Sequence, residues 1–477
     1  MRRRAILVTV ALLTMLGAGI WYFGKRSGSG TTADLIPALD DSPPNFDVLP
    51  TERRKVEVGE VEGWRWAKLG LNEKLTAAAP ASQTPRVVVC TANRAVHLLD
   101  FQRGESGRLR NDSKTDTELG PKGGYSVALS DGSAWFARTL RSIDLDDSDE
   151  QKKTFEPFWV SEFVQVARVT NPNANIGVIP QWAGMVGSLA FSPDGRRLAV
   201  GTSPVTINGF RSAIPSTVNL WELADARGWQ PNDLDKEHDR RARPQKARWE
   251  SGPIRDAFDV QSLAWSGNGR LVAAVGSAGG QGALYRSSFR DPAERALDPF
   301  ERVKRVNVRR ASRSKGANEP SEGPLDVWDG FNQFRYVLCC WDAQTGAVVG
   351  EWRNDRPYVE SQMRVALPNG EPRPRVVYRG EDGVVVDQFE QGKERPSRRA
   401  LGKDISVSAF VGSDAALVLG RDGVIWIEEP AANKQVDRWD AKTLLGVLAG
   451  WEATTSADGK AVALWHESGV ILYRTRP

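Results

Sequence analysis

Cysteine is scarce in this chain, with three residues among 477. They are Cys90 and the adjacent pair Cys339 and Cys340, which are too few for a disulfide framework. Adjacent residues of a strand point to opposite faces, so Cys339 and Cys340 are not expected to bond to each other. We therefore expect three buried thiols with a structural role.

Histidine is equally scarce, and the three histidines are scattered without the spacing of metal ligands or of a proton relay. The Gly-x-Ser-x-Gly sequence that marks the nucleophile of one large class of hydrolases is also missing. The net charge of +4 is small for 477 residues and argues against a dedicated nucleic-acid-binding protein. These absences predict a protein without catalytic residues, metal ligands or a cofactor.

A recurring pattern of strands and turns is the most informative feature that is present. Val186–Gly201 alternates apolar residues into the turn Ser192–Gly195 and out again, and Val218–Glu222 supplies a third strand that ends with Trp221 and glutamate. Small polar residues and glycine at such turns suit a tight connection that needs positive φ. Equivalent turns are Leu129–Gly132, Ser266–Gly269, Leu367–Gly370, Val411–Asp414 and Ser456–Gly459.

The spacing and the tryptophan positions of these units resemble the WD40 repeat family. The last three turns start 44 and 45 residues apart, close to the roughly 40–45 residue period of WD40 blades. Two literal Trp-Asp pairs also occur. The residues that carry the motif are Asp194, Gly195, Trp221, Trp341, Asp342, Trp439, Asp440, Asp458 and Gly459.

The resemblance covers about residues 56–477 and implies an all-β fold, a single seven-bladed WD40-like propeller. An open ring would leave two bare sheet edges, so we expect a strand near Trp64–Ala67 to complete the last blade beside Val470–Tyr473. An eight-bladed ring is the alternative. It needs two core strands between Ala311 and Gln333, a stretch too rich in turn-forming residues.

The chain departs from the WD40 pattern at its histidines. The Gly-His dipeptide that often opens a WD40 repeat is absent, because the only histidines are His97, His238 and His466. The buried Asp-His-Ser-Trp network familiar from that family is therefore not carried over. Another all-β propeller with looser repeats, of the quinoprotein or hydrolase-associated type, is the alternative family.

The N-terminus carries one long apolar segment. Residues 5–23 hold no charge and would span roughly 28 Å as a helix, close to the thickness of a membrane's hydrocarbon core. Arg2, Arg3 and Arg4 precede it, which predicts a transmembrane signal anchor with residues 1–4 in the cytoplasm and the propeller outside. A signal peptide cleaved near Gly17–Gly19 is the alternative. Residues 24–55 follow as a flexible linker rich in Gly, Ser and Pro.

Three longer segments are expected on the same rim of the propeller, which predicts a binding face for the main partner. They are Asn171–Gly184, Ser203–Pro215 and the long insert Gly279–Arg335. A basic run in the insert supplies candidate contacts to an anionic partner, although acidic neighbours also favour an ordinary solvated loop. The candidate contacts are Arg305, Arg309, Arg310 and Arg313.

The sequence therefore predicts a membrane-tethered propeller that serves as a protein–protein interaction platform. We expect a protein or peptide partner, contact with the membrane through residues 5–23, no nucleic acid and no cofactor. The alternative is an exported, quinoprotein-like propeller enzyme with a cofactor in its central channel. One stretch, Trp341–Gly346 followed by Trp352, matches the repeat of quinoprotein propellers.

Overall fold

The computed structural model describes residues 53–475 with several gaps. The gaps are 93–94, 111–125, 144–159, 171–174, 182–183, 205, 208–209, 212–216, 224–248, 251–257, 279–334, 355–357, 369–371, 381–382, 392, 394–395, 413–414, 431–433 and 447–449. The chain divides into two compact units, Met1–Asp40 and Asp41–Pro477, and every described element belongs to the second. The expected transmembrane segment, residues 5–23, lies outside the described residues. Within them, no helix has the length and apolar character needed to cross a membrane.

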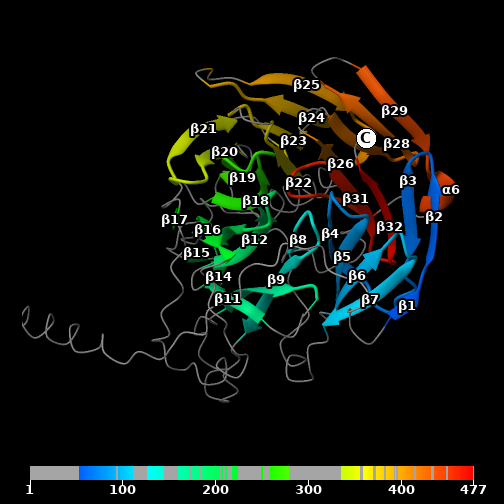
Figure 1. Ribbon diagram of the computed structural model, residues 1–477. Coiled ribbons are helices and arrows are strands. Elements are labelled where there is room, and N and C mark those ends of the chain that lie inside the picture. The colour runs from blue at the N-terminus through cyan, green and yellow to red at the C-terminus, as the bar shows by residue number, and fades with distance from the viewer. Residues whose placement is uncertain are drawn as a thin grey trace, which may run out of the picture. The chain divides into compact units, whose positions relative to one another are not determined.

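Seven antiparallel sheets form the seven blades of a β-propeller, numbered in chain order with strands given from the centre outward (Figure 1). Blade 1 contains β4 (Leu75–Pro80), β5 (Arg86–Thr91), β6 (Val96–Asp100), β7 (Glu105–Arg110) and an added outer strand, β1 (Arg53–Lys55). Blade 2 contains β8 (Val127–Leu129), β9 (Trp135–Ile143), β10 (Val160–Arg168) and β11 (Asn175–Gln181). Blade 3 contains β12 (Gly184–Phe191), β13 (Arg197–Pro204), β16 (Val218–Glu222) and β17 (Trp249–Glu250).

Blade 4 contains β18 (Phe258–Trp265), β19 (Leu271–Ala278), β20 (Arg335–Asp342) and β21 (Val348–Asn354). Blade 5 contains β22 (Tyr358–Ala366), β23 (Arg375–Gly380), β24 (Gly383–Gln388) and β25 (Ser397–Gly402). Blade 6 contains β26 (Ile405–Val411), β27 (Ala415–Gly420), β28 (Val424–Glu429) and β29 (Lys434–Asp440). Blade 7 contains β30 (Trp451–Thr455), β31 (Ala461–His466), β32 (Val470–Thr475), β3 (Trp64–Lys68) and β2 (Glu57–Val61).

The first strands of the blades line the centre of the ring. They contact one another in the order β4, β8, β12, β18, β22, β26 and β30, and β30 contacts β4 in turn. Two short strands, β14 (Thr206–Ile207) and β15 (Phe210–Arg211), pair with each other after β13, and α6 (Lys442–Leu445) is a single helical turn. The expected all-β, seven-bladed propeller is confirmed.

Apolar side chains fill the spaces between neighbouring blades, because successive residues of a strand point to opposite faces. On β5, Val88 and Cys90 pack with blade 2, whereas Val87 and Val89 pack with blade 7. On β20, Cys339 lies in the core between blades 3 and 4, and the adjacent Cys340 lies in the core between blades 4 and 5. All three cysteines are buried and free, as expected.

The two ends of the domain close the ring. Strand β3 pairs with β32 in the register Arg65↔Tyr473 to Lys68↔Val470, which confirms the predicted closure. The preceding strand β2 pairs with the outer edge of β3, and β1 pairs with the outer edge of β7 in blade 1. Residues 53–61 therefore form a strap across the outer edges of blades 1 and 7, the two blades that meet at what we call the seam.

One expected rim loop is a strand instead. Half of Asn171–Gly184, the seven residues Asn175–Gln181, forms β11, the outermost strand of blade 2, paired with β10. The segment suggests a loop because it contains Gly177 and Pro180, but an outermost strand tolerates both residues, since only one of its edges is hydrogen bonded. The other two predicted rim segments, Ser203–Pro215 and Gly279–Arg335, lie largely outside the described residues.

Candidate functional site

The turns between the first and second strands of the blades all lie on one rim, which we call the turn rim. In blade 3 the Asp194 carboxylate accepts hydrogen bonds from the Ser192 hydroxyl and from the Arg196 N–H, the latter at 3.1 Å. Gly195 has a φ of 69°, which glycine adopts without strain. These predicted motif residues therefore build the turn.

Blade 7 repeats this arrangement. Asp458 Oδ1 accepts from the Ser456 hydroxyl and the Lys460 N–H, both at 2.9 Å, and Gly459 has a φ of 76°. Blade 4 uses asparagine in the same way, since the Ser266 hydroxyl donates to Asn268 Oδ1 at 2.8 Å. The same turn can therefore be built with either Asp or Asn at this position.

The tryptophans of the motif are packing residues, and they occupy two different strands. Trp221 and Trp341 are buried on the third strands of blades 3 and 4, whereas Trp439 is buried on β29, the fourth strand of blade 6. Trp439 stacks on Trp64 of blade 7 with ring centroids 6.1 Å apart. The Trp439-Asp440 pair is therefore not equivalent in position to Trp341-Asp342.

The aspartates after these tryptophans organise local turns. Asp342 Oδ1 accepts from the Thr345 N–H at 2.8 Å, the Thr345 hydroxyl at 2.9 Å and the Gln344 N–H at 3.0 Å. The hydrogen bond from the Thr345 backbone is the main cause that lowers the pKa of Asp342. Asp440 accepts from the Lys442 N–H at 3.1 Å. The stretch that matches quinoprotein repeats thus uses its carboxylate within its own turn.

The candidate anionic-partner contacts Arg305, Arg309, Arg310 and Arg313 lie outside the described residues. The strands that flank the insert are described, and they locate its two ends. Ala278, at the end of β19, pairs directly with Arg335, at the start of β20. Both ends lie on the rim opposite the turn rim, which we call the insert rim, and Pro204 at the end of β13 reaches the same rim.

Neighbouring turns on the turn rim are joined by hydrogen bonds. Arg197 Nη2 of blade 3 donates to the Gly269 carbonyl of blade 4 at 2.9 Å. The Gln83 N–H of blade 1 donates to the Asp131 carbonyl of blade 2 at 3.1 Å. Ser82 of blade 1 donates to Asp458 Oδ2 of blade 7 at 2.9 Å. The last two bonds tie blade 1 to both of its neighbours.

The turn of blade 2 departs from the motif by one position. Its hydrogen bond from Ser133 N–H to the Ser130 carbonyl matches that from Gly195 to Ser192, both at 2.8 Å. Ser133 thus occupies the glycine position, with a φ of 58°. Asp131 then takes the position held by Pro193, Gly267 and Ala457 in other blades, rather than the position of the turn-building aspartate.

This displacement buries the Asp131 carboxylate. Asp131 is 1% exposed, and neither carboxylate oxygen has a hydrogen bond of good geometry among the described residues, although Ser82 and the Asp458 backbone lie close enough to act on it weakly. Burial is the main cause that raises its pKa to about 7, and the nearby charge of Asp458 raises it further. Ser82, the Asp458 backbone and Lys460 oppose the shift only in part. The sequence shows the turn, but only its hydrogen bonds reveal that Asp131 is out of place.

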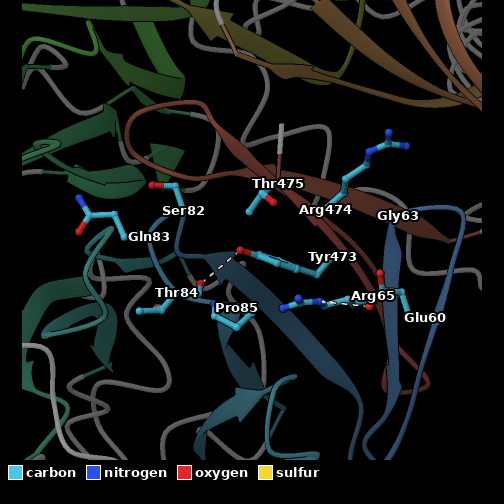
Figure 2. A pocket seen from close by; sticks show the side chains of 10 residues that line it. All are labelled: Glu60, Gly63, Arg65, Ser82, Gln83, Thr84, Pro85, Tyr473, Arg474 and Thr475. Carbon is cyan, nitrogen blue, oxygen red and sulfur yellow. Dashed lines mark hydrogen bonds and ion pairs between the residues drawn. The ribbon is translucent and has the colours of Figure 1, made fainter. Parts of the chain in front are cut away.

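A cavity of about 330 Å³ opens at the seam, on the turn rim, and we call it the seam pocket (Figure 2). The Tyr473 hydroxyl donates towards the carbonyls of Ala81, at 2.9 Å, and Thr84, at 3.2 Å. The Arg65 side chain extends towards Pro85, with Nε 3.7 Å from the nearest Glu60 carboxylate oxygen (Figure 2). The lining residues are Glu60, Gly63, Arg65, Ser82, Gln83, Thr84, Pro85, Tyr473, Arg474 and Thr475.

The seam pocket offers hydrogen-bond donors and acceptors to a ligand. Burial raises the pKa of Tyr473 above its usual value, so its hydroxyl stays protonated and serves as a donor. None of the ten lining residues pairs a nucleophile with a histidine or another base in the way that covalent catalysis requires. Within the described residues, no cluster of three or more His, Cys, Asp or Glu side chains is placed to hold a metal ion.

No protein-family model matches the chain, and no curated protein matches it either. The propeller fold is therefore established by the sheets themselves.

Proposed function

We propose that this protein is a WD40-like propeller that is tethered to a membrane by residues 5–23 and acts as a protein–protein interaction platform outside the cytoplasm. A closed propeller commonly serves as such a platform, since its loops project from a rigid ring. The insert rim is the binding face in this proposal, and the partner is a protein or peptide.

The pairing of Ala278 with Arg335 is the observation that carries this proposal. The two strands β19 and β20 are neighbours along their whole length, from Leu271↔Asp342 to Ala278↔Arg335. A turn of a few residues would connect them, so the fold itself does not require the 56 residues of 279–334. An insertion of this size that the scaffold does not need is typical of a binding segment.

Shortening the insert tests the binding face. Residues 279–334 are replaced by a Gly-Ser turn in the full-length protein, and partners are then compared by crosslinking in native membranes followed by mass spectrometry. We expect crosslinks of the unmodified protein to one defined partner and their loss in the shortened variant. Replacing residues 224–248, which connect the third and fourth strands of blade 3 on the turn rim, by the same turn is the matched control. Unchanged crosslinking by the variant lacking 279–334 would remove the insert from the binding face.

The tether is tested separately by topology. Protease added to intact spheroplasts should digest the propeller and leave a membrane-bound fragment that contains residues 5–23. Full protection of the propeller would overturn the proposed orientation. A mature N-terminus near Ile20, found by mass spectrometry, would show a cleaved signal peptide instead of an anchor.

We propose no catalytic role for the protein. The motif that suggested a quinoprotein-like enzyme forms the turn after β20, with three hydrogen bonds to Asp342 from its own loop. A bound quinone or haem would colour the purified protein, so its visible absorbance spectrum checks this part of the proposal. A stoichiometric chromophore would favour the enzyme.

A further inference from the structure

Asp131, in the turn of blade 2, carries a carboxyl group that is buried. A carboxylate without hydrogen bonds is costly to bury, and buried charges are normally paired or neutralised. Asp131 is 1% exposed, and its oxygens have no hydrogen bond of good geometry among the described residues, so the contributions of Ser82 and the Asp458 backbone are weak. Its neighbour at the equivalent position of blade 7, Ala457, shows that the turn does not need a charge there.

The groups that act on Asp131 come from two neighbouring blades. Blade 7 contributes the charges of Asp458 and Lys460 and blade 1 contributes the Ser82 hydroxyl, while Tyr473 of blade 7 lies within electrostatic range of both aspartates. Lys460 Nζ lies 3.3 Å from Asp458 Oδ2, which also accepts from Ser82 at 2.9 Å. Lys460 and Ser82 are thus both engaged by Asp458.

A proton suits this place better than a metal ion does. Asp458 Oδ1 accepts two hydrogen bonds within its own turn, and Oδ2 faces Ser82 and Lys460. Little of the Asp458 carboxylate remains for metal coordination, which for hard cations takes six or more oxygen ligands. A proton on Asp131 removes the buried charge and ends the repulsion between the two carboxylates.

We propose that Asp131 and Asp458 form a proton-binding site in which one proton, carried by Asp131, locks blades 7, 1 and 2 together at the seam. With the proton bound, only one negative charge remains, and Ser82 and Lys460 balance it. When the proton leaves, the Asp131 carboxylate is charged and is repelled by the nearby charge of Asp458. The turn rim beside the seam pocket then becomes less stable.

The direction of the pH effect follows from the pKa values. Asp131 has an ordinary pKa of 3.8 when unfolded and about 7 when folded, so the folded state holds the proton more tightly. The stabilisation is fully present below the unfolded value and is lost as the pH rises through the folded value. The seam therefore weakens between about pH 4 and about pH 7.

Thermal melting of the full-length protein as a function of pH tests the proposal. The Tm of Asp131→Asn, which mimics the protonated side chain, should exceed that of the unmodified protein by several degrees at about pH 8 and by little at about pH 5. Asp458→Asn should also flatten the profile, because asparagine is accepted at this turn position in blade 4. Asp194→Asn is the matched control. It changes the same turn position in blade 3, where the side chain is 48% exposed, and should leave the pH profile unaltered.

Superimposable profiles for Asp131→Asn and the unmodified protein would overturn the proposal. A measurement on the unmodified protein covers the case in which the variants do not fold. Its infrared spectrum at about pH 5.5 should contain the C=O stretch of a protonated carboxylic acid, which should be lost by about pH 8.5. Absence of that band at the lower pH would equally overturn the proposed proton site.

Discussion

Asp387 shows how a single buried carboxylate joins two blades. Its side chain has no exposed surface and accepts hydrogen bonds from Tyr336 at 2.7 Å and Tyr378 at 3.1 Å. Arg398 donates to it through Nε at 2.7 Å and Nη2 at 2.8 Å. Tyr336 belongs to blade 4 and the other three residues to blade 5, so this network of hydrogen bonds spans two blades. The carboxylate charge is paired with the Arg398 guanidinium. The hydrogen bond to Asp387 raises the pKa of Arg398 above its usual value.

We expect Asp387→Ala to lower the free energy of unfolding by about 3 kcal/mol, because it leaves the Arg398 charge and two tyrosine hydroxyls without their acceptor. Glu57→Ala removes an exposed ion pair to Lys68 on the outer strands and should cost less than about 1 kcal/mol. Urea unfolding of both full-length variants measures the difference. Similar losses in the two variants would show that the Asp387 network adds no stability of its own.

The limits of sequence reasoning are clearest at single residues. Asp458 and Asp194 could be assigned to turns from sequence because each is followed by glycine at the expected distance. Asp131 looked equivalent, since it too precedes glycine. The glycine position of its turn, however, is held by Ser133 with a φ of 58°. Only the backbone conformation shows this one-residue displacement, because a serine in that conformation carries no clear sequence signal.

At the scale of elements, the strap β1–β2 adds a second layer to the closure of the ring. Lys55 Nζ forms an ion pair with Glu105 at 2.8 Å, and the Val56 N–H donates to the Gly104 carbonyl at 3.1 Å. Inside the strap, β3 fills the fourth position of blade 7 beside β32. The strap and β3 therefore have different structural roles. The strap covers outer edges, whereas β3 completes a blade.

Two truncations separate these contributions. Removal of residues 1–55 deletes β1 alone and should lower the Tm by only a few degrees, since one exposed three-residue strand is lost. Removal of residues 1–70 also deletes β2 and β3, which bares the edge of β32 and should abolish a single cooperative transition. Calorimetry of the two proteins checks both results. A protein lacking 1–70 that melts at the parent temperature would refute closure through β3.

Strands were predictable from sequence where apolar and polar residues alternate regularly along them. The closing strand could be expected from Trp64–Ala67 because a ring with a free edge is unfavourable and this segment suits a half-buried strand. Strand β11 was missed, since Gly177 and Pro180 interrupt its pattern. Of the strap, only β1 was missed, because it is short, charged and exposed, which are the properties of a linker as much as of an edge strand.

At the scale of the whole molecule, stability and binding are expected to be separable. The core lies between the blades, and the flanks of the long insert pair with each other at Ala278 and Arg335. We therefore expect replacement of 279–334 by a short turn to change the Tm by no more than a few degrees. A large fall in Tm, measured by calorimetry, would show that the insert contributes to the fold and would also undermine its use as a test of binding.

Six of the seven blades were predictable from turns that recur in the chain, because each turn must belong to a blade. The binding face was harder to predict from the sequence. Loop lengths can be counted in a sequence, yet a segment such as Asn175–Gln181 can be absorbed into a sheet edge without any change in length. The seam pocket could not be foreseen, since Ser82 and Tyr473 come from opposite ends of the domain.

The closure of the ring also sets the order in which the protein can be completed during synthesis. Trp64 of β3 leaves the ribosome early, whereas its partner strand β32 begins only at Val470. At 5–20 residues per second, the wait is roughly 20–80 s. Throughout that time the β2–β3 hairpin has an unpaired edge and two tryptophans with no blade to cover them. Completion of the propeller thus depends on β32, so a nascent chain needs protection from aggregation until that strand has been made.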